Sequence, residues 1–347
     1  MQKNSFTRLF GSSTELVELH SHVGGSVHPA IMWSIAHEQG IRLPTKDYWA
    51  FFDLITVPAP GKVHGMDELD KLFHWTEMIQ SSPLAIERSI YDIIGGAYRK
   101  SNITLLEVRF NPMKRNRKGE QDLDHIIMAA LRGMDKATLE FPYVRAGIIL
   151  MLDRTFTQRQ NEVIVGKAIK YKNRGIIGID LAGPQHPDFR VSDYGDIFAR
   201  AKNAGLGVTF HTGEEGSVDE MREVLDIIKP RRIGHGFLAS RDTSVMKRLA
   251  SEGIVLELCP TSNIKLGLVS SAEEFKTIIG KFKEHGVKFT INTDGPEMLE
   301  TNLQKEMMWL LKNEILTKEE LLQTNEWARE ASFILSETNL FIPRNGE

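Results

Sequence analysis

Short apolar segments recur along the chain and are separated by longer amphipathic segments. After a first segment at Leu16–Leu19, this pattern predicts strands at residues 103–110, 144–151, 176–181, 206–211, 232–235, 254–258 and 287–292. Apolar strands that alternate with helices indicate a parallel sheet covered by helices. Eight such units favour an α/β fold of the closed (β/α)8 type, the TIM-type barrel.

The ends of several helices are marked by their own sequence. A Ser or Thr followed three residues later by Glu predicts a capping box at three helix starts: Ser217 with Glu220, Ser271 with Glu274, and Thr317 with Glu320. A glycine just before a strand predicts a left-handed helix end at Gly205, Gly253 and Gly286. These signals fix the order of the elements.

The segment between the first two strands, about residues 23–102, is far longer than an ordinary crossover of this fold. It contains many large apolar side chains, among them Trp33, Phe51 and Phe73. Because the segment follows the carboxyl end of a strand, we expect an extra helical lid that roofs the pocket. Most of these side chains are expected to pack the lid onto the barrel, and some to line the substrate cavity.

Length and composition fit one large domain, residues 1–347, since barrels of this type commonly exceed ~250 residues. The chain is 41% hydrophobic and 26% charged, and its net charge of −3 gives no sign of a nucleic-acid or membrane partner. A single cysteine, Cys259, and an N-terminus without a long apolar run predict a cytoplasmic protein. A small-molecule substrate is expected, and a homo-oligomer remains possible.

Histidines and one aspartate stand where the predicted strands end. His20 and His22 close the first strand, His211 and His235 close two later ones, and Asp294 follows the last. The carboxyl ends of parallel barrel strands meet at one face, and side chains two apart on a strand share a side. Imidazoles and a carboxylate gathered there predict a catalytic metal site of the Zn²⁺ type.

The segments around these residues carry a resemblance. The chain resembles the adenosine deaminase family of metal-dependent amidohydrolases over most of its length. The similarity lies in Glu18-Leu19-His20-Ser21-His22, Glu107-Val108-Arg109-Phe110-Asn111-Pro112, Ile179-Asp180-Leu181-Ala182-Gly183, His211-Thr212-Gly213-Glu214, Gly234-His235-Gly236, Cys259-Pro260-Thr261-Ser262-Asn263 and Asn292-Thr293-Asp294, all in the family's order.

This resemblance implies the role of each site residue. One Zn²⁺ per chain would be bound by His20, His22, His211 and Asp294, although other divalent metals also suit such donors. Glu214 would be the catalytic proton carrier to the ring nitrogen next to the attacked carbon. His235 would orient and help deprotonate the attacking water, and the backbone of Gly183 would contact the purine.

The function implied is metal-dependent hydrolytic deamination of a 6-aminopurine nucleoside, of the adenosine or deoxyadenosine type, to an inosine-type product and ammonia. Two departures bear on substrate binding. The family usually has an aspartate at Gly24, contacting the ribose 5′ hydroxyl, and another at Gly295, hydrogen-bonding the purine. The alternatives are therefore a deaminase of a modified adenosine such as 6-aminodeoxyfutalosine, or of another amino-substituted heterocycle. A barrel that binds a nucleoside without catalysis is less favoured, because it has no need of Glu214 and His235.

Two further expectations concern charged residues near the strand ends. Arg109 on the second strand is expected to form a buried ion pair with Glu107. The basic run Lys114-Arg115-Asn116-Arg117-Lys118 is expected to be a solvated loop. Folded over the pocket instead, it would meet an acidic substrate such as a nucleotide or a carboxylated nucleoside.

Overall fold

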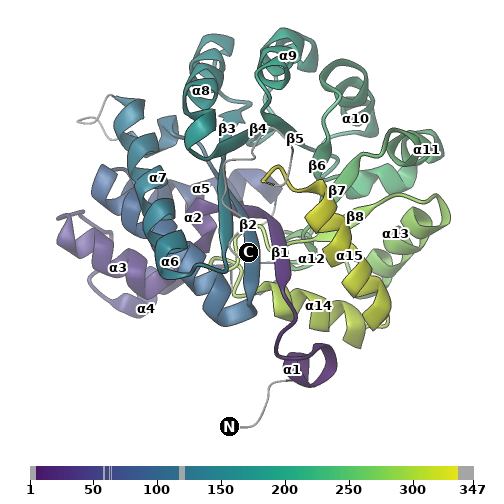
Figure 1. Cartoon of the computed structure of the whole chain (residues 1–347), viewed down its shortest axis with the longest axis horizontal. Helices are drawn as coiled ribbons and strands as arrows, with labels where there is room; N and C mark the ends of the chain where they lie inside the picture. Colours follow the sequence, from purple (N-terminus) through teal and green to yellow (C-terminus); the bar gives the residue numbers. More distant parts are fainter. Residues whose placement is uncertain (1–4, 58, 62, 64, 117–121, 335–347) are drawn as a thin grey trace, which may run out of the picture.

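Eight parallel strands form the centre of the molecule and helices surround them (Figure 1). The computed structural model describes residues 5–57, 59–61, 63, 65–116 and 122–334. The strands are β1 Leu16–His22, β2 Ile103–Phe110, β3 Arg145–Asp153, β4 Ile176–Ala182, β5 Gly207–Thr212, β6 Arg232–His235, β7 Val255–Leu258 and β8 Phe289–Ile291. They pair in chain order from β1 to β8, which confirms the predicted barrel.

The barrel closes between β8 and β1 through the backbone of Asp294. A parallel bridge joins Ser21 to Asp294. The His22 N–H donates to the Asp294 carbonyl (2.6 Å), and the Asp294 N–H donates to the His20 carbonyl (2.9 Å). Asp294 adopts a left-handed conformation, φ 63°, where the chain leaves β8. The seam of the barrel therefore runs through the predicted metal site.

Helices follow most strands and cover the outside of the barrel. They are α1 Ser5–Phe10, α2 Val23–Ser26, α3 Pro29–Glu38, α4 Tyr48–Ile55, α5 Gly65–Ile79, α6 Pro83–Ser101, α7 Leu123–Glu140, α8 Gln158–Tyr171, α9 Gly195–Asn203, α10 Val218–Glu223, α11 Thr243–Glu252, α12 Pro260–Lys265, α13 Ala272–Glu284, α14 Leu303–Lys312 and α15 Lys318–Ala331. Among the described residues, none of these helices has the length and apolar character needed to cross a membrane.

The predicted helix ends at the glycines are confirmed, but only one of the three predicted capping boxes is reciprocal. Gly205, Gly253 and Gly286 have positive φ, as left-handed helix ends require. The predicted capping box at Thr317 is reciprocal, with Glu320 reaching back to the cap. At Ser271 the hydroxyl caps α13, but the Glu274 carboxylate accepts from Ser270 instead of from the cap. At Ser217 the hydroxyl caps α10, but the carboxylate of Glu220 turns away toward the active-site face. There the carboxylate binds a buried guanidinium, which is the stronger partner in a buried environment.

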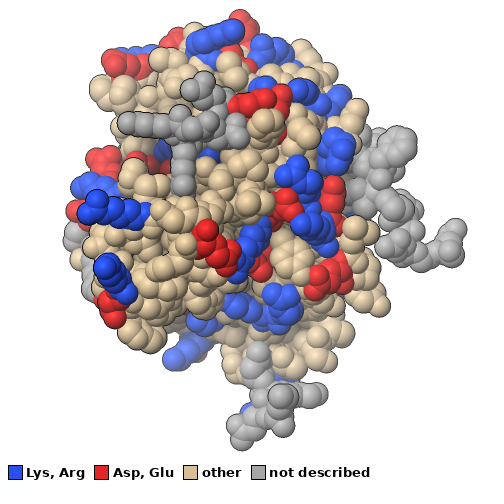
Figure 2. All heavy atoms as spheres, turned by 90° about the vertical axis from the view of Figure 1, so that its left-hand side faces the viewer, with Lys and Arg blue, Asp and Glu red and all other residues tan. Residues whose placement is uncertain are grey.

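Helices α2 to α6 occupy the long connection between β1 and β2. Trp33 of α3 packs on Phe51 of α4, with ring centroids 5.1 Å apart, so these aromatics join the lid's own helices. Helix α5 instead carries Phe73 to the pocket. Figure 2 shows the face on this side of the molecule, where acidic and basic side chains are interspersed without a large patch of one sign.

The barrel interior changes character along its axis because of a bulge in β1. Between Glu18 and Ser21 the register with β2 shifts by one residue. Consecutive residues Leu19 and His20 therefore both face inward. Leu19 packs in an apolar floor with Val17, Leu105, Ile149, Ile177, Val255 and Phe333, while His20 joins the histidines above.

Candidate active site

Three imidazoles converge at the carboxyl ends of the strands. The Nε2 atom of His22 lies 3.1 Å from that of His20 and 3.2 Å from that of His211. Asp294 completes the group, with Oδ1 3.5 Å from the His22 Nε2. Nitrogen ligands about 2.0–2.1 Å from a tetrahedral Zn²⁺ are separated by similar distances. The donor set and spacing therefore fit one divalent metal ion held by three nitrogens and one oxygen.

Buried carboxylates orient two of these rings. Glu257 of β7 lies 2.7 Å from the His20 Nδ1, and Asp180 of β4 lies 2.9 Å from the His211 Nδ1. Each contact leaves the Nε2 of its ring directed at the shared centre, which is how carboxylates commonly support metal-bound histidines. Arg109 of β2 joins the two carboxylates, at 2.9 Å from Asp180 and 2.8 Å from Glu257.

A second buried arginine supports Glu257 from below. Arg232 contacts Glu257 and Glu107, each at 2.6 Å. Burial alone would raise the pKa of the Glu257 carboxyl, but Arg109 and Arg232 outweigh it and lower the pKa to about 2. The expected pair of Arg109 with Glu107 is therefore wrong: Glu107 pairs with Arg232, and Arg109 pairs with strands farther away.

The sequence pattern predicted no role for these supporting residues. Asp180, Arg232 and Glu257 are fully buried; Asp180 and Glu257 lie within otherwise apolar strands, and Arg232 begins β6. That placement was an available signal, since a charged residue on a buried strand needs a partner. It does not reveal which distant strand supplies the partner.

Glu214 and His235 lie beside the imidazole cluster. The Glu214 Oε1 is 3.4 Å from the His235 Nε2 and has no hydrogen-bond partner among the described residues. Burial, together with the nearby Asp294 carboxylate, raises the pKa of Glu214 well above its usual value. Burial and the neighbouring His211 lower the pKa of His235. A carboxyl with a raised pKa thus lies next to an imidazole with a lowered pKa, a pair suited to donate and to accept a proton.

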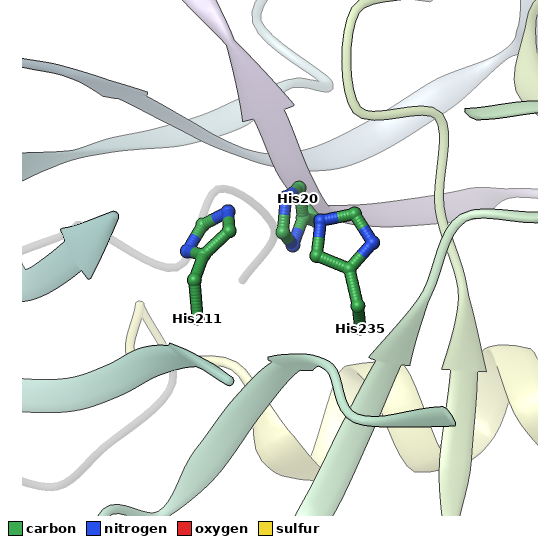
Figure 3. Close-up of side chains that lie close together, drawn as sticks. All are labelled: His20, His211 and His235. Carbon is green, nitrogen blue, oxygen red and sulfur yellow. The ribbon is translucent and has the colours of Figure 1, made fainter. Parts of the chain in front are cut away.

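Figure 3 shows His235 with His20 and His211, the three rings facing one another at the strand ends. The ring centroid of His235 lies 4.8 Å from that of His20 and 5.2 Å from that of His211. The side chain of Asn263 contacts the His235 Nδ1 at 3.2 Å and holds the ring from the opposite side. His235 is therefore fixed at the edge of the donor cluster.

Gly183 follows β4 and forms part of the pocket wall. Its φ of 96° is strained for any residue with a side chain, and a Cβ there would lie 2.9 Å from the Asp153 Oδ1. The buried guanidinium of Arg154 donates to the Gly183 carbonyl (3.0 Å), to the His211 carbonyl and to Glu220 (2.9 Å). Arg154 thereby ties the turn at Gly183 to the strand end that carries His211.

Both glycines at the family's usual aspartate positions are closely packed. A Cβ on Gly24 would lie 2.7 Å from the ring of Phe73, and one on Gly295 would lie 3.2 Å from the Cα of Gly25. Gly24 lines the pocket, whereas Gly295 is pressed against the backbone of α2. Neither position has room for a carboxylate without movement of its neighbours.

The pocket has an empty volume of about 640 Å³, part of it open to solvent. Its lining includes Lys114 and Arg115, so the expectation of a solvated loop is wrong for these two residues. Arg115 is buried, and Lys114 is partly buried, because both bind carboxylates of the pocket wall. Residues 117 and 118 of the same basic run lie outside the described residues.

Sequence comparison matches this chain to one protein family and to individual relatives. The sequence profile of the adenosine deaminase family matches residues 16–342. Adenosine deaminase of Vibrio vulnificus strain YJ016 is 30% identical over 304 residues, covering 88% of this chain and 89% of the relative. Adenosine deaminase of Enterococcus faecalis is 30% identical over 318 residues, covering 92% and 91%.

Solved structures of low sequence identity share the fold. Adenine deaminase from Arthrobacter aurescens has a TM-score of 0.82 at 20% identity and covers 94% of this chain and 96% of its own. A Burkholderia ambifaria amidohydrolase with bound Zn also scores 0.82 at 20% identity, covering 98% and 91%. The N6-mAMP deaminase of Arabidopsis scores 0.76 at 23% identity, covering 94% and 96%.

Proposed function

Because this chain belongs to the adenosine deaminase family and is a hydrolytic deaminase, we propose that it acts on an adenine nucleoside and uses one zinc ion. The reaction would convert adenosine or deoxyadenosine and water to the 6-oxo nucleoside and ammonia. The observation that carries the proposal is the convergence of three Nε2 atoms beside the Glu214–His235 pair in one pocket. Zinc is favoured because a three-nitrogen, one-oxygen donor set suits it.

In this proposal His20, His22, His211 and Asp294 hold the ion. When bound, the ion supplies a strong nucleophile by lowering the pKa of water to near neutrality. The buried carboxylates behind His20 and His211 would accept the Nδ1–H of each ring, so that Nε2 is the atom that faces the ion. Ser262 donates to Asp294 Oδ2 at 2.6 Å, which leaves Oδ1 on the side of His22.

The proton transfers fall to Glu214 and His235. Glu214 delivers its proton to the ring nitrogen beside the attacked carbon, which makes that carbon more electrophilic. His235, neutral before reaction, accepts a proton from the attacking water at Nε2. His235 then gives this proton to the leaving amine, and the hydroxyl on the attacked carbon returns its proton to Glu214. Ammonia departs, and the ring keeps a carbonyl oxygen and a protonated nitrogen. The Gly183 backbone, held by Arg154, would contact the purine edge.

A second candidate substrate competes with adenosine in this proposal. The positions of Gly24 and Gly295 favour a deaminase of a modified adenosine, such as 6-aminodeoxyfutalosine, because the usual carboxylates are missing. Another amino-substituted heterocycle is the less specific alternative.

The first experiment is turnover by the zinc-loaded protein of adenosine, deoxyadenosine, AMP, adenine and 6-aminodeoxyfutalosine. Ammonia release and the ultraviolet change at the ring are followed, and Glu214→Gln is the matched control. Adenosine turnover near ~10⁴ M⁻¹s⁻¹ or above, lost in the control by about 10²-fold or more, supports the proposal. Fast turnover of the modified nucleoside beside slow adenosine turnover would favour the alternative.

A non-catalytic barrel would give a different result. It would bind a nucleoside without releasing ammonia, and Glu214→Gln would leave binding intact. Metal content by atomic absorption and folding by circular dichroism, each measured before and after a chelator, separate loss of the ion from loss of fold.

A further inference from the structure

One side of the pocket is lined by charged residues that no proposed step uses. This side, the distal wall, is formed by Asp70 and Glu77 of α5, by Asn111, Lys114 and Arg115 after β2, and by Asp153 at the end of β3. The proposed metal donors come from β1, β5 and the end of β8, and none of the residues of the distal wall is among them.

Both cations of the distal wall are already paired. Lys114 Nζ lies 2.8 Å from Asp153 and 3.2 Å from Asp70. Arg115 is 2.7 Å from Glu77. The described part of this wall therefore holds three carboxylates against two cations, which leaves no unpaired positive charge for an anionic group.

Asn111 adds an unused donor to this wall. Its Oδ1 accepts the backbone N–H groups of Met113 (2.8 Å) and Lys114 (3.2 Å), which fixes the orientation of the amide. The Nδ2 is buried and has no hydrogen-bond partner among the described residues. A buried amide donor without a partner destabilises the empty pocket, and a substrate acceptor would remove that cost.

We propose that the distal wall selects an uncharged, hydroxyl-bearing substituent on the purine and rejects a phosphate. This inference rests on the proposed function and names its substrate class. A hydroxyl can accept from the Asn111 amide and donate to a carboxylate of Asp153 or Glu77. A phosphate at neutral pH only accepts, so it would meet the acceptor oxygens of three carboxyl groups and cations that are already paired.

The packing around Gly24 explains why this wall takes the role. Phe73 fills the space beside Gly24, so a carboxylate cannot project from β1's side of the pocket. Recognition of the sugar side then passes to residues that follow β2 and β3 and to the lid helix α5. The polar groups that recognise the sugar side thus lie on the distal wall instead of at the position of Gly24. Ion pairing between the carboxylates and the cations reduces the net charge of this wall.

The test compares kcat/KM for adenosine and AMP with the zinc enzyme. We expect adenosine to be preferred by about 10²-fold, since a like-charge contact costs several kcal/mol. Equal or faster turnover of AMP would overturn the inference while leaving the deaminase proposal intact. Absence of turnover with both adenosine and AMP, and with the other adenine nucleosides, would instead count against the proposed function and remove the basis of the inference.

Charge-neutralising variants test the mechanism of selection. Glu77→Gln frees Arg115 and Asp70→Asn weakens the pairing of Lys114, so each is expected to raise the AMP-to-adenosine ratio of kcat/KM by about tenfold. Asp67→Asn, on the same helix but outside the pocket lining, is the matched control and is expected to leave the ratio unchanged. Unchanged ratios in both test variants would show that charge pairing at this wall does not select the substrate.

A fourth variant tests the amide donor. Asn111→Asp keeps an oxygen for the two backbone N–H groups but replaces the Nδ2 donor by a carboxylate oxygen. We expect the KM for adenosine to rise about tenfold with a smaller change in kcat, as loss of a ground-state contact requires. An unchanged KM in a folded variant, judged by circular dichroism, would contradict the role of Asn111.

Discussion

Adding a methyl group at Gly24 tests whether Phe73 closes the position where relatives carry a carboxylate. Gly24 lies in α2 with an ordinary backbone conformation, so Gly24→Ala meets no strain from φ. A compatible Gly→Ala change in a helix gains ~0.5–1 kcal/mol. The new Cβ would lie 2.7 and 3.0 Å from two ring atoms of Phe73 and 3.1 Å from the Thr76 Oγ1.

These contacts set the expected size of the effect. Overpacking costs ~1–3 kcal/mol. After the helix gain is subtracted, we expect Gly24→Ala to lower the free energy of unfolding by about 0–2.5 kcal/mol. The matched control is Gly166→Ala in α8, where an added Cβ meets no atom within 4 Å, and it should raise stability by ~0.5–1 kcal/mol.

Equilibrium urea denaturation followed by tryptophan fluorescence measures both variants, with midpoints compared at unchanged slope. In a Phe73→Ala background, Gly24→Ala should become neutral or stabilising, a coupling of about 1 kcal/mol or more. If Gly24→Ala and Gly166→Ala stabilise the protein equally, the reasoning fails. Gly24→Asp should also fail to improve adenosine turnover, because it displaces the Phe73 ring that lies 6.0 Å from the ring of His22.

Three other predictions follow from buried charges and from the proposed ion. Arg232→Met leaves Glu107 and Glu257 without their shared cation and is expected to lower the free energy of unfolding by about 3–5 kcal/mol, measured by urea denaturation; a loss below 1 kcal/mol would contradict it. Burial raises the pKa of Glu306 from 4.5 to about 6, so the folded state binds this proton more tightly than the unfolded chain does. Stability from this group is then full below pH 4.5 and falls as the pH rises to about 6, and Glu306→Gln should flatten that part of the pH profile of the urea midpoint; an unchanged profile would refute it. Zinc at 100 times its dissociation constant should stabilise the folded protein by about 2.7 kcal/mol over the chelated form, seen by thermal scanning, whereas equal melting temperatures would argue against a bound ion.

The barrel and its order could be predicted because their signals are local. Apolar strands, helix caps and the left-handed ends at Gly205, Gly253 and Gly286 depend on neighbours within a few residues. The strand-end positions of His20, His22 and His211 followed from the same pattern, since parallel strands end at one face.

Other features depend on contacts between distant parts of the chain. The sequence neighbours Glu107 and Arg109 looked like a pair, but Arg109 reaches Asp180 and Glu257 on β4 and β7. No local pattern identifies such partners, because they are set by the closure of the barrel.

The prediction of a solvated loop for the basic run after β2 was wrong for a similar reason. The high charge density of this run predicted a solvent-exposed loop. Helix α5 instead places Glu77 against Arg115 and Asp70 against Lys114. The acidic partners lie more than thirty residues earlier in the sequence, within a lid whose packing the sequence pattern does not specify.

The bulge in β1 has a consequence for how this protein can change over evolutionary time. Below Leu19 the barrel interior is sealed by apolar side chains, and above His20 it is lined by imidazoles. Asn111, Lys114 and Phe73 are not among the residues of the apolar floor. Substitutions around Asn111, Lys114 and Phe73 can therefore change the substrate specificity while the apolar floor stays intact. New specificities can then arise with little loss of folding stability.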